Sequence, residues 1–133
     1  MAAAVGGLYT GQPMSPTTSP DDCLFCKIRD GKIPAKIVHR DEQCIGFEDI
    51  RPQAPTHVLF IPVEHIETVN DISVEDRERV GHLFLAAAKV AKDRGFAGNG
   101  YRVVMNCNAD AGQTVFHIHL HLLGGRPLTW PPG

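Results

Sequence analysis

The chain of 133 residues carries a formal net charge of −2 at pH 7, with 15 acidic and 13 basic residues interspersed along it. This length suits one compact domain with a single core. The charge pattern offers no basic face for nucleic acid, and no apolar run approaches the roughly 18 residues that a membrane-spanning helix needs. We therefore expect neither nucleic acid nor a membrane as a partner. The four cysteines, in a chain that lacks a secretory signal, favour reduced thiols and a cytoplasmic location.

Residues 1–20 are rich in Ala, Gly, Pro, Ser and Thr, which predicts a disordered leader. A single folded domain is expected over residues 21–133. It begins with two candidate N-cap residues, Asp21 and Asp22, ahead of a short helix that runs to about Asp30.

Five short segments have the apolar and β-branched character of strands. They cover residues 37–40, 44–48, 58–61, 101–105 and 115–123. A longer helix is expected to begin at Ser73, which forms a capping box with Asp76, and to end near Arg94, before Gly95. Strand pairs joined by short turns, together with one long helix, predict an α+β domain with an antiparallel sheet.

The last predicted strand carries three alternating histidines, His117, His119 and His121. Alternation places them on one face of the strand, about 6.5–7 Å apart, while the apolar residues between them anchor the other face. Two histidines at positions i and i+2 can share a zinc ion, and a single histidine positioned by its neighbours can act as a nucleophile. The spacing alone leaves both interpretations open.

This strand resembles the His-φ-His-φ-His-φ-φ signature (φ, apolar) of the histidine triad superfamily. The resemblance to its Hint branch extends over the rest of the chain from about Asp22. It is carried by 49-DIRPQAPTH-57, Ile61-Pro62 followed by His65, Gly100-Tyr101-Arg102, Asn106, Gly112-Gln113, Leu123-Gly124-Gly125-Arg126 and the terminal Trp-Pro-Pro-Gly.

The resemblance implies a HIT-like fold with about five antiparallel strands, one long helix and one short helix. It also implies a homodimer whose sheets join into one continuous sheet, with Trp130 near the partner's active site. The implied activity is hydrolysis of a purine nucleoside phosphoramidate, which releases a nucleoside monophosphate of the AMP type from a phosphorus–nitrogen bond.

By its place in the motif, His119 is implied to be the nucleophile that forms a nucleotidyl-histidine intermediate. Attack through Nε2 requires the proton on Nδ1, so we expect a hydrogen bond from His119 to a main-chain carbonyl. His121 and His57 are expected to contact phosphate oxygens, and His117 completes the catalytic set.

Thr114 is implied to lie near the leaving amine, and Asn106 to orient the site. The N–H groups of residues 112–114 are expected to add donors to the phosphate. Asp49 suits both ribose hydroxyls, although a loop-capping role is the alternative. The nucleotide contacts implied by the resemblance further include an apolar slot for the base and the turn before the triad: Leu24, Phe25, Ile28, Phe47 and Ile50, with Gly112 and Gln113.

The Cys23-x-x-Cys26 pair resembles that of bacterial-type histidine-triad proteins, some of which bind structural zinc. The implied ligands are Cys23, Cys26, His57 and His117, a set that satisfies tetrahedral zinc. The alternative is two reduced thiols packed under the helix. Either way, no cofactor is expected to be required for catalysis.

Other functions remain in competition with this one. A diadenosine-polyphosphate hydrolase of the Fhit branch is the nearest enzyme, but the 49-DIRPQAPTH-57 segment and the terminal Trp-Pro-Pro-Gly favour Hint. Uridylyltransferases of the family typically carry Gln where this chain has His121. A nucleotide-binding regulatory or scaffold protein, and a metal-storage or metal-sensing domain, are the alternatives outside catalysis.

Overall fold

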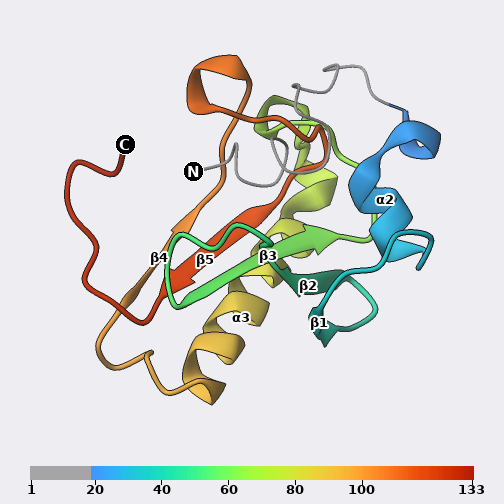
Figure 1. Cartoon of the computed structure of the whole chain (residues 1–133). Coiled ribbons are helices and arrows are strands. Elements are labelled where there is room, and N and C mark those ends of the chain that lie inside the picture. The colour runs from blue at the N-terminus through green and yellow to red at the C-terminus, as the bar shows by residue number, and fades with distance from the viewer. Residues whose placement is uncertain (1–18) are drawn as a thin grey trace.

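The computed structural model describes residues 19–133 (Figure 1). Its regular elements are α2 (Leu24–Arg29), β1 (Ile37–Arg40), β2 (Cys44–Glu48), β3 (Thr56–Pro62), α3 (Arg77–Asp93), β4 (Tyr101–Val104) and β5 (Leu120–Gly124), with 3-10 turns at Pro20–Asp22, Val69–Asp71, Val74–Asp76 and Ala109–Ala111. The strands form one antiparallel sheet in the order β1-β2-β3-β5-β4. The predicted α+β class, with about five strands, one long helix and one short helix, is confirmed.

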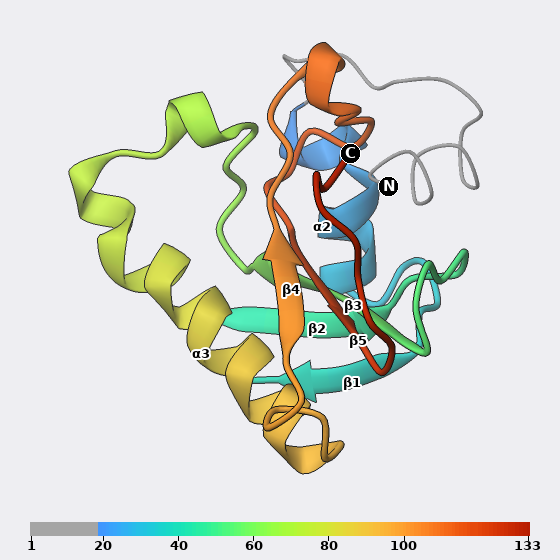
Figure 2. The same ribbon diagram turned by 90° about the vertical axis from the view of Figure 1, so that its left-hand side faces the viewer.

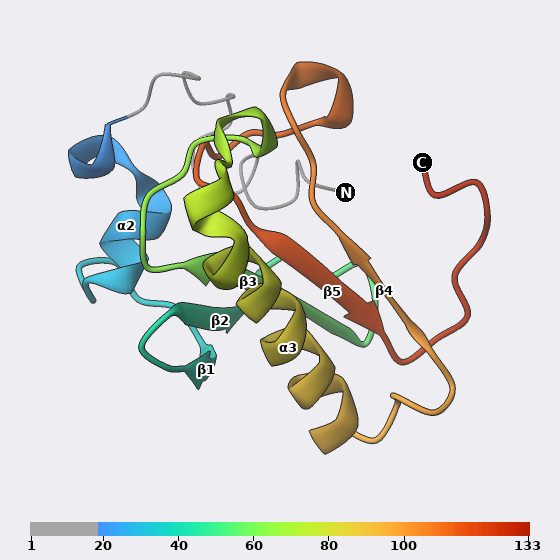
Figure 3. The ribbon, with the colours of Figure 1, turned by 180° about the vertical axis from the view of Figure 1, so that it is seen from behind.

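The sheet separates two apolar cores. Helix α3 crosses one face, as seen from behind in Figure 3, while α2 packs on the other side near the end of β3 (Figure 2). Strand β3 is buried along its whole length and serves both cores, because its side chains alternate. Val58 and Phe60 belong to the core beneath α3, and Leu59 and Ile61 belong to the core beneath α2. Two different environments therefore lie on opposite faces of the same strands.

The N-terminal part differs from the sequence prediction. The predicted leader of residues 1–20 lies almost wholly outside the described residues, but Pro20 begins a 3-10 turn. This turn uses Asp21 and Asp22, so neither of them caps α2. Cys23 is the N-cap instead, because its backbone is extended and its thiol sulfur accepts the N–H of Cys26.

The capping box predicted for the long helix is confirmed, since Ser73 and Asp76 bond to each other reciprocally. The residues immediately after Ser73 form a 3-10 turn, so the α-helix proper starts at Arg77. At its far end Gly95 has a φ of +85°, a conformation that glycine adopts without strain.

Strand β5 begins at Leu120, five residues later than predicted. The register pairs Leu120 with Phe60, which puts residue 118 opposite Pro62. Proline has no N–H to continue the ladder. The backbone N–H of Ile118 donates instead to the carbonyl of Ile66, 2.7 Å away. Residues 115–119 are therefore a buried, irregular approach to the strand.

Candidate active site and cysteine–histidine group

The sheet face opposite α3 carries a row of histidine rings. His57 on β3 and His121 on β5 belong to adjacent strands, and their ring centroids lie 5.1 Å apart. The His119 ring lies 5.1 Å from that of His121, and Phe25 of α2 meets His119 edge-on at 5.0 Å. These histidines are at most 2% exposed, so the row is held in place from both sides.

The expected hydrogen bond from His119 to the main chain is confirmed. Its Nδ1 lies 2.8 Å from the carbonyl oxygen of His117. A carbonyl only accepts hydrogen bonds, so Nδ1 carries the proton and Nε2 keeps its lone pair. Burial lowers the pKa of His119 to about 4, although this carbonyl bond works in the opposite direction. The neutral ring with a free Nε2 is thus the form present at pH 7.

The proton positions of His57 and His121 follow from one backbone donor. The N–H of Gln53 donates to His57 Nδ1 over 3.0 Å, so the proton of a neutral His57 sits on Nε2. That atom lies 2.9 Å from Nδ1 of His121 and donates to it. The remaining proton of His121 is then on Nε2, which makes this atom a hydrogen-bond donor. Burial lowers the pKa of both rings, that of His57 to about 4.

Asp49 lies beside this relay. Its Oδ2 is 3.4 Å from His57 Nε2, and both side chains are fully buried. Its Oδ1 accepts the N–H of Arg51 over 2.9 Å, which is the loop-capping role considered for this residue. Burial raises the pKa of Asp49 to about 6. One oxygen thus holds the loop while the other remains available.

Within residues 19–133, the buried side-chain atoms without a hydrogen-bond partner all belong to predicted site residues. They are Asp49 Oδ2, Asn106 Nδ2, Thr114 Oγ1 and His121 Nε2. An unpaired buried polar group costs about 1–3 kcal/mol, so folded proteins rarely leave one without a reason. Asn106 Nδ2 and His121 Nε2 are donors, Asp49 Oδ2 is an acceptor, and the Thr114 hydroxyl can donate or accept. This set suits a polar ligand that carries phosphate and hydroxyl groups.

The turn before the triad acts differently from the prediction. The N–H groups of Gly112 and Gln113 are already used, because they donate to the carbonyls of Ala109 and Asn108. The Gln113 side chain is also fully engaged: its Oε1 accepts the N–H of Asn108, and its Nε2 donates to the carbonyls of Glu67 and Val115. Gln113 holds the loop in position, and its side-chain and main-chain N–H groups are already engaged.

The predicted apolar slot divides into two parts. Leu24, Phe25, Ile28 and Phe47 are buried in the core beneath α2, where Phe25 and Phe47 pack edge to face at 5.4 Å. Ile50, in contrast, is 48% exposed beside Asp49. Core packing therefore accounts for the four buried residues, and Ile50 offers open apolar surface.

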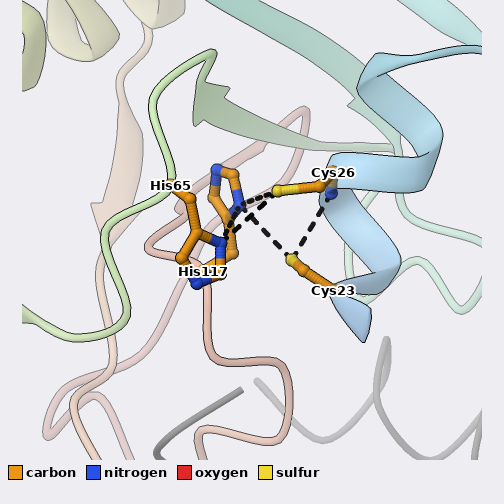
Figure 4. A group of neighbouring side chains, drawn as sticks. All are labelled: Cys23, Cys26, His65 and His117. Atoms are coloured by element: carbon orange, nitrogen blue, oxygen red, sulfur yellow. Dashed lines mark hydrogen bonds between the residues drawn. The ribbon is translucent and has the colours of Figure 1, made fainter. Parts of the chain in front are cut away.

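The predicted cysteine–histidine group forms, but with one different member (Figure 4). The ligand atoms of Cys23, Cys26, His65 and His117 all lie within 4.8 Å of one another. His57 was predicted in place of His65, and this is corrected: His57 belongs to the group of Asp49 and His121. The reason is the course of the chain, because His57 is fixed in β3 facing β5, whereas His65 lies in the loop after Pro62 that turns toward α2.

The atoms of this group fit tetrahedral zinc. His117 Nδ1 lies 3.4 Å from Cys23 Sγ, 3.5 Å from Cys26 Sγ and 3.3 Å from His65 Nδ1, and Cys26 Sγ lies 3.4 Å from His65 Nδ1. Zinc bond lengths place neighbouring ligand atoms roughly 3.3–3.8 Å apart. The Nε2–H of His117 donates to the Pro62 carbonyl over 2.9 Å, which turns the Nδ1 lone pair toward the sulfurs.

A consequence for the triad is that His117 is separated from the other two histidines. Both of its ring nitrogens are engaged, one with Pro62 and one with the cysteine group. Without a metal, burial raises the pKa of Cys23 to about 12 and lowers that of His117 to about 3. The predicted phosphate contact of His57 is corrected too, because its Nδ1 accepts the N–H of Gln53 and its Nε2–H donates to His121. Of the predicted phosphate contacts, only that of His121 keeps an unpartnered ring nitrogen.

A model of the HIT domain family matches residues 30–128. The chain belongs to the HIT domain family. Over 108 residues, 81% of this chain and 91% of the other, it is 50% identical to the purine nucleoside phosphoramidase of Escherichia coli. It is also similar to the solved structure of a HIT family hydrolase from Legionella pneumophila, with 54% identity, a TM-score of 0.82, and coverage of 84% of this chain and 99% of that one.

A further structural relative is a zinc-bound histidine triad family protein from Mycobacterium smegmatis. It is 33% identical, with a TM-score of 0.70 and coverage of 81% of this HIT chain and 78% of the other. Among the helices of residues 19–133, none has the length and apolar character to cross a membrane.

Proposed function

We propose that the protein is a purine nucleoside phosphoramidate hydrolase that works through a nucleotidyl-histidine intermediate. The observation that carries this proposal is the orientation of His119, whose Nδ1–H is tied to the His117 carbonyl so that Nε2 remains a nucleophile. The 50% identity to a purine nucleoside phosphoramidase and the unpartnered polar atoms of Asp49, Asn106, Thr114 and His121 support it.

In the first step, Nε2 of His119 attacks phosphorus while the phosphorus–nitrogen bond breaks. The amine leaves with its electron pair and takes up a proton from solvent. His121 Nε2–H is the donor suited to a phosphate oxygen, where negative charge accumulates in the transition state. The Thr114 hydroxyl is suited to the departing amine. Asn106 supplies a further side-chain donor.

In the second step, water attacks the phosphorus of the nucleotidyl-histidine. The phosphorus–Nε2 bond breaks, its electron pair returns to His119, and nucleoside monophosphate is released while the proton lost by the water passes to solvent. His119 returns to its neutral form, because the pKa lowered by burial makes the ring a good leaving group. His57 takes part by fixing the tautomer of His121.

For the nucleoside, Asp49 Oδ2 is the acceptor suited to ribose hydroxyls, and exposed Ile50 is suited to the base. The substrate is then a small purine nucleotide derivative.

The test is incubation with adenosine 5′-phosphoramidate, comparing the native protein with His119→Ala and with Lys89→Ala, which changes an exposed residue on α3. We expect AMP release by the native protein and Lys89→Ala, and loss of nearly all activity in His119→Ala. Intact mass spectrometry of the quenched native reaction should show an adenylylated protein. Equal hydrolysis by the native protein and His119→Ala would refute the nucleophile assignment.

Faster turnover of diadenosine polyphosphates would favour the alternative hydrolase, and binding without turnover of either compound would favour a regulatory or scaffold role.

We also propose that Cys23, Cys26, His65 and His117 hold a structural zinc ion. The tetrahedral spacing of their ligand atoms and the zinc-bound relative support this assignment. The positive charge of Zn²⁺ would stabilise the two cysteines as thiolates, and the ion would join α2 to the loop after β3. None of the steps above requires a metal, so no cofactor takes part in catalysis.

A cytoplasmic homodimer formed by a single domain over residues 21–133 completes the proposal. The unpaired state of all four cysteines fits a reducing compartment. Trp130 is 78% exposed near the C-terminus, beneath the guanidinium of Arg102 at 5.9 Å. Exposed Leu85 on α3 adds apolar surface, and contact with a second copy would cover both. Light scattering on the full chain tests the dimer, and Trp130→Ala tests the tail's contact with the partner's site through kcat.

A further inference from the structure

A second cluster of metal-binding side chains lies on the other face of the sheet, beneath α3. It consists of His39 in β1, Asp41 in the following turn, Cys44 at the start of β2 and His82 on α3. One ligand atom from each lies within 4.8 Å of those from all the others. The first three form a short His-x-Asp-x-x-Cys sequence, and the fourth comes from a helix far away in the chain.

The cluster converges on one oxygen atom. Asp41 Oδ2 lies 2.6 Å from His39 Nε2, 2.7 Å from His82 Nε2 and 3.7 Å from the thiol sulfur of Cys44. Its other oxygen, Oδ1, accepts the N–H groups of Gln43 and Cys44 over 2.8 and 2.9 Å. The turn thus fixes the Asp41 carboxylate through Oδ1, while side chains from β1, β2 and α3 point toward Oδ2.

The sheet makes room for this arrangement. His39 is paired with Gly46 on β2, and its ring lies 6.2 Å from that of Phe60. A Cβ atom at position 46 would lie only 2.7 Å from Phe60 Cε1 and 3.2 Å from the Cβ of His39. Glycine at this position therefore leaves room for the Phe60 ring and the His39 side chain on this face of the sheet.

We propose that His39, Asp41, Cys44 and His82 bind a second zinc ion, which joins the β1–β2 hairpin to α3. Two imidazoles, a thiolate and a carboxylate are donors that zinc accepts, whereas calcium and magnesium require oxygen ligands. The thiolate and carboxylate together neutralise the charge of Zn²⁺. Binding releases the thiol proton of Cys44 and moves each imidazole proton from Nε2 to Nδ1, with no oxidation or reduction.

The required rearrangement is small. Tetrahedral zinc places nitrogen and oxygen ligands roughly 3.3 Å apart. The two hydrogen-bonded pairs of 2.6 and 2.7 Å therefore lengthen as the metal replaces the protons between them. The distance of 3.7 Å between Cys44 Sγ and Asp41 Oδ2 already suits two ligands of one ion.

The site also has a route for the ion. The side chains of His39, Asp41 and His82 are 16%, 31% and 26% exposed, although Cys44 is buried. A surface groove alongside is lined mainly by acidic residues: Glu42, Glu64, Glu75 and Glu78, together with Gln43, Val63 and Arg79. Such a rim raises the local concentration of cations.

The experiment must separate this site from the cysteine pair near α2. The full-length Cys23→Ser, Cys26→Ser double variant is stripped with a chelator and then reloaded with zinc. Native mass spectrometry then counts the bound ions, and a Co²⁺ titration follows the near-ultraviolet thiolate-to-cobalt band. The comparison variants add His82→Gln or Cys44→Ala, and Lys89→Gln on the same helix is the matched control. Circular dichroism verifies folding of each variant.

We expect one zinc ion in the double variant and in its Lys89→Gln derivative. Outer-shell substitutions alone cost about 10- to 100-fold in metal affinity, so loss of the His82 ligand should cost more than about 100-fold. Cys44→Ala should abolish the cobalt band. The proposal is overturned if the double variant retains no zinc, if His82→Gln binds it equally well, or if the band survives Cys44→Ala. If the double variant does not fold, the native chain is compared with its His82→Gln variant, and an unchanged zinc count overturns the proposal.

Discussion

His57 Nε2 lies 2.9 Å from His121 Nδ1, and this contact determines which nitrogen of His121 carries its proton. The backbone N–H of Gln53 orients His57, and His57 in turn presents His121 as an Nε2–H donor. A main-chain amide outside the triad thus orients the histidine that we propose to contact the phosphate. We expect catalysis to depend on this ordered series of three hydrogen-bonding groups.

Replacing His57 with leucine should therefore impair catalysis through His121. Loss of a buried hydrogen-bond partner costs about 1–3 kcal/mol, which corresponds to a fall in kcat of about 5- to 150-fold, with KM little changed. His57→Gln, whose amide N–H can still donate, should recover part of the loss. Steady-state kinetics on adenosine 5′-phosphoramidate provide the measurement, and full kcat in the leucine variant would contradict the relay.

Asp49→Asn should stabilise the protein above pH 6. Burial raises the pKa of Asp49 from 3.8 to about 6, so the folded state holds a proton between these values that the unfolded state has lost. Stability consequently falls as pH rises through this interval, by at most about 3 kcal/mol, and stays lower above it. Asparagine carries no charge and so avoids this penalty. The free energies of unfolding of the native protein and Asp49→Asn should therefore differ at pH 7.5 and become similar near pH 4. Urea unfolding at both pH values measures this, and a more stable native protein at pH 7.5 would contradict it.

Gln113→Ala should destabilise the fold as well as the site. Both ends of this buried amide bond to the main chain, so alanine leaves the N–H of Asn108 and the carbonyl of Glu67 without their partner. We expect a loss of about 1–3 kcal/mol in the free energy of unfolding. The matched control is Gln53→Ala, because the side chain of Gln53 is exposed and donates to the nearby Arg51 carbonyl. Similar losses in both variants would refute this role for Gln113.

Zinc content should distinguish His65 from His57. Substitution of His65 with alanine removes a ligand of the Cys23–Cys26 group and should lower its zinc affinity by more than about 100-fold. His57→Leu should leave the zinc content unchanged. Chelation of native protein should also lower its melting temperature, because the metal binds the folded state. Retention of this zinc by His65→Ala, or its loss in His57→Leu, would instead favour His57, the ligand predicted from the sequence.

Much of the fold could be predicted from local patterns. The capping box of Ser73 and Asp76, the terminal Gly95 and the short strand segments are all encoded within a few neighbouring residues. The predicted element boundaries were wrong where they depend on contacts with residues outside the segment itself. Strand β5 starts late because Pro62 breaks the ladder opposite residue 118, and Cys23 caps α2 because the preceding residues form their own turn.

The sequence by itself determined the family resemblance and the alternation of three histidines, because both depend only on residue types and their spacing along the chain. The expected Nδ1–H on His119 followed from the nucleophilic role that this resemblance implies. The tertiary structure decided which distant groups meet. His65 joined the cysteines in place of His57, and His82 of α3 reached Asp41 of the hairpin. These contacts depend on the path of the chain after β3 and on the packing of α3, and spacing along one segment does not specify either.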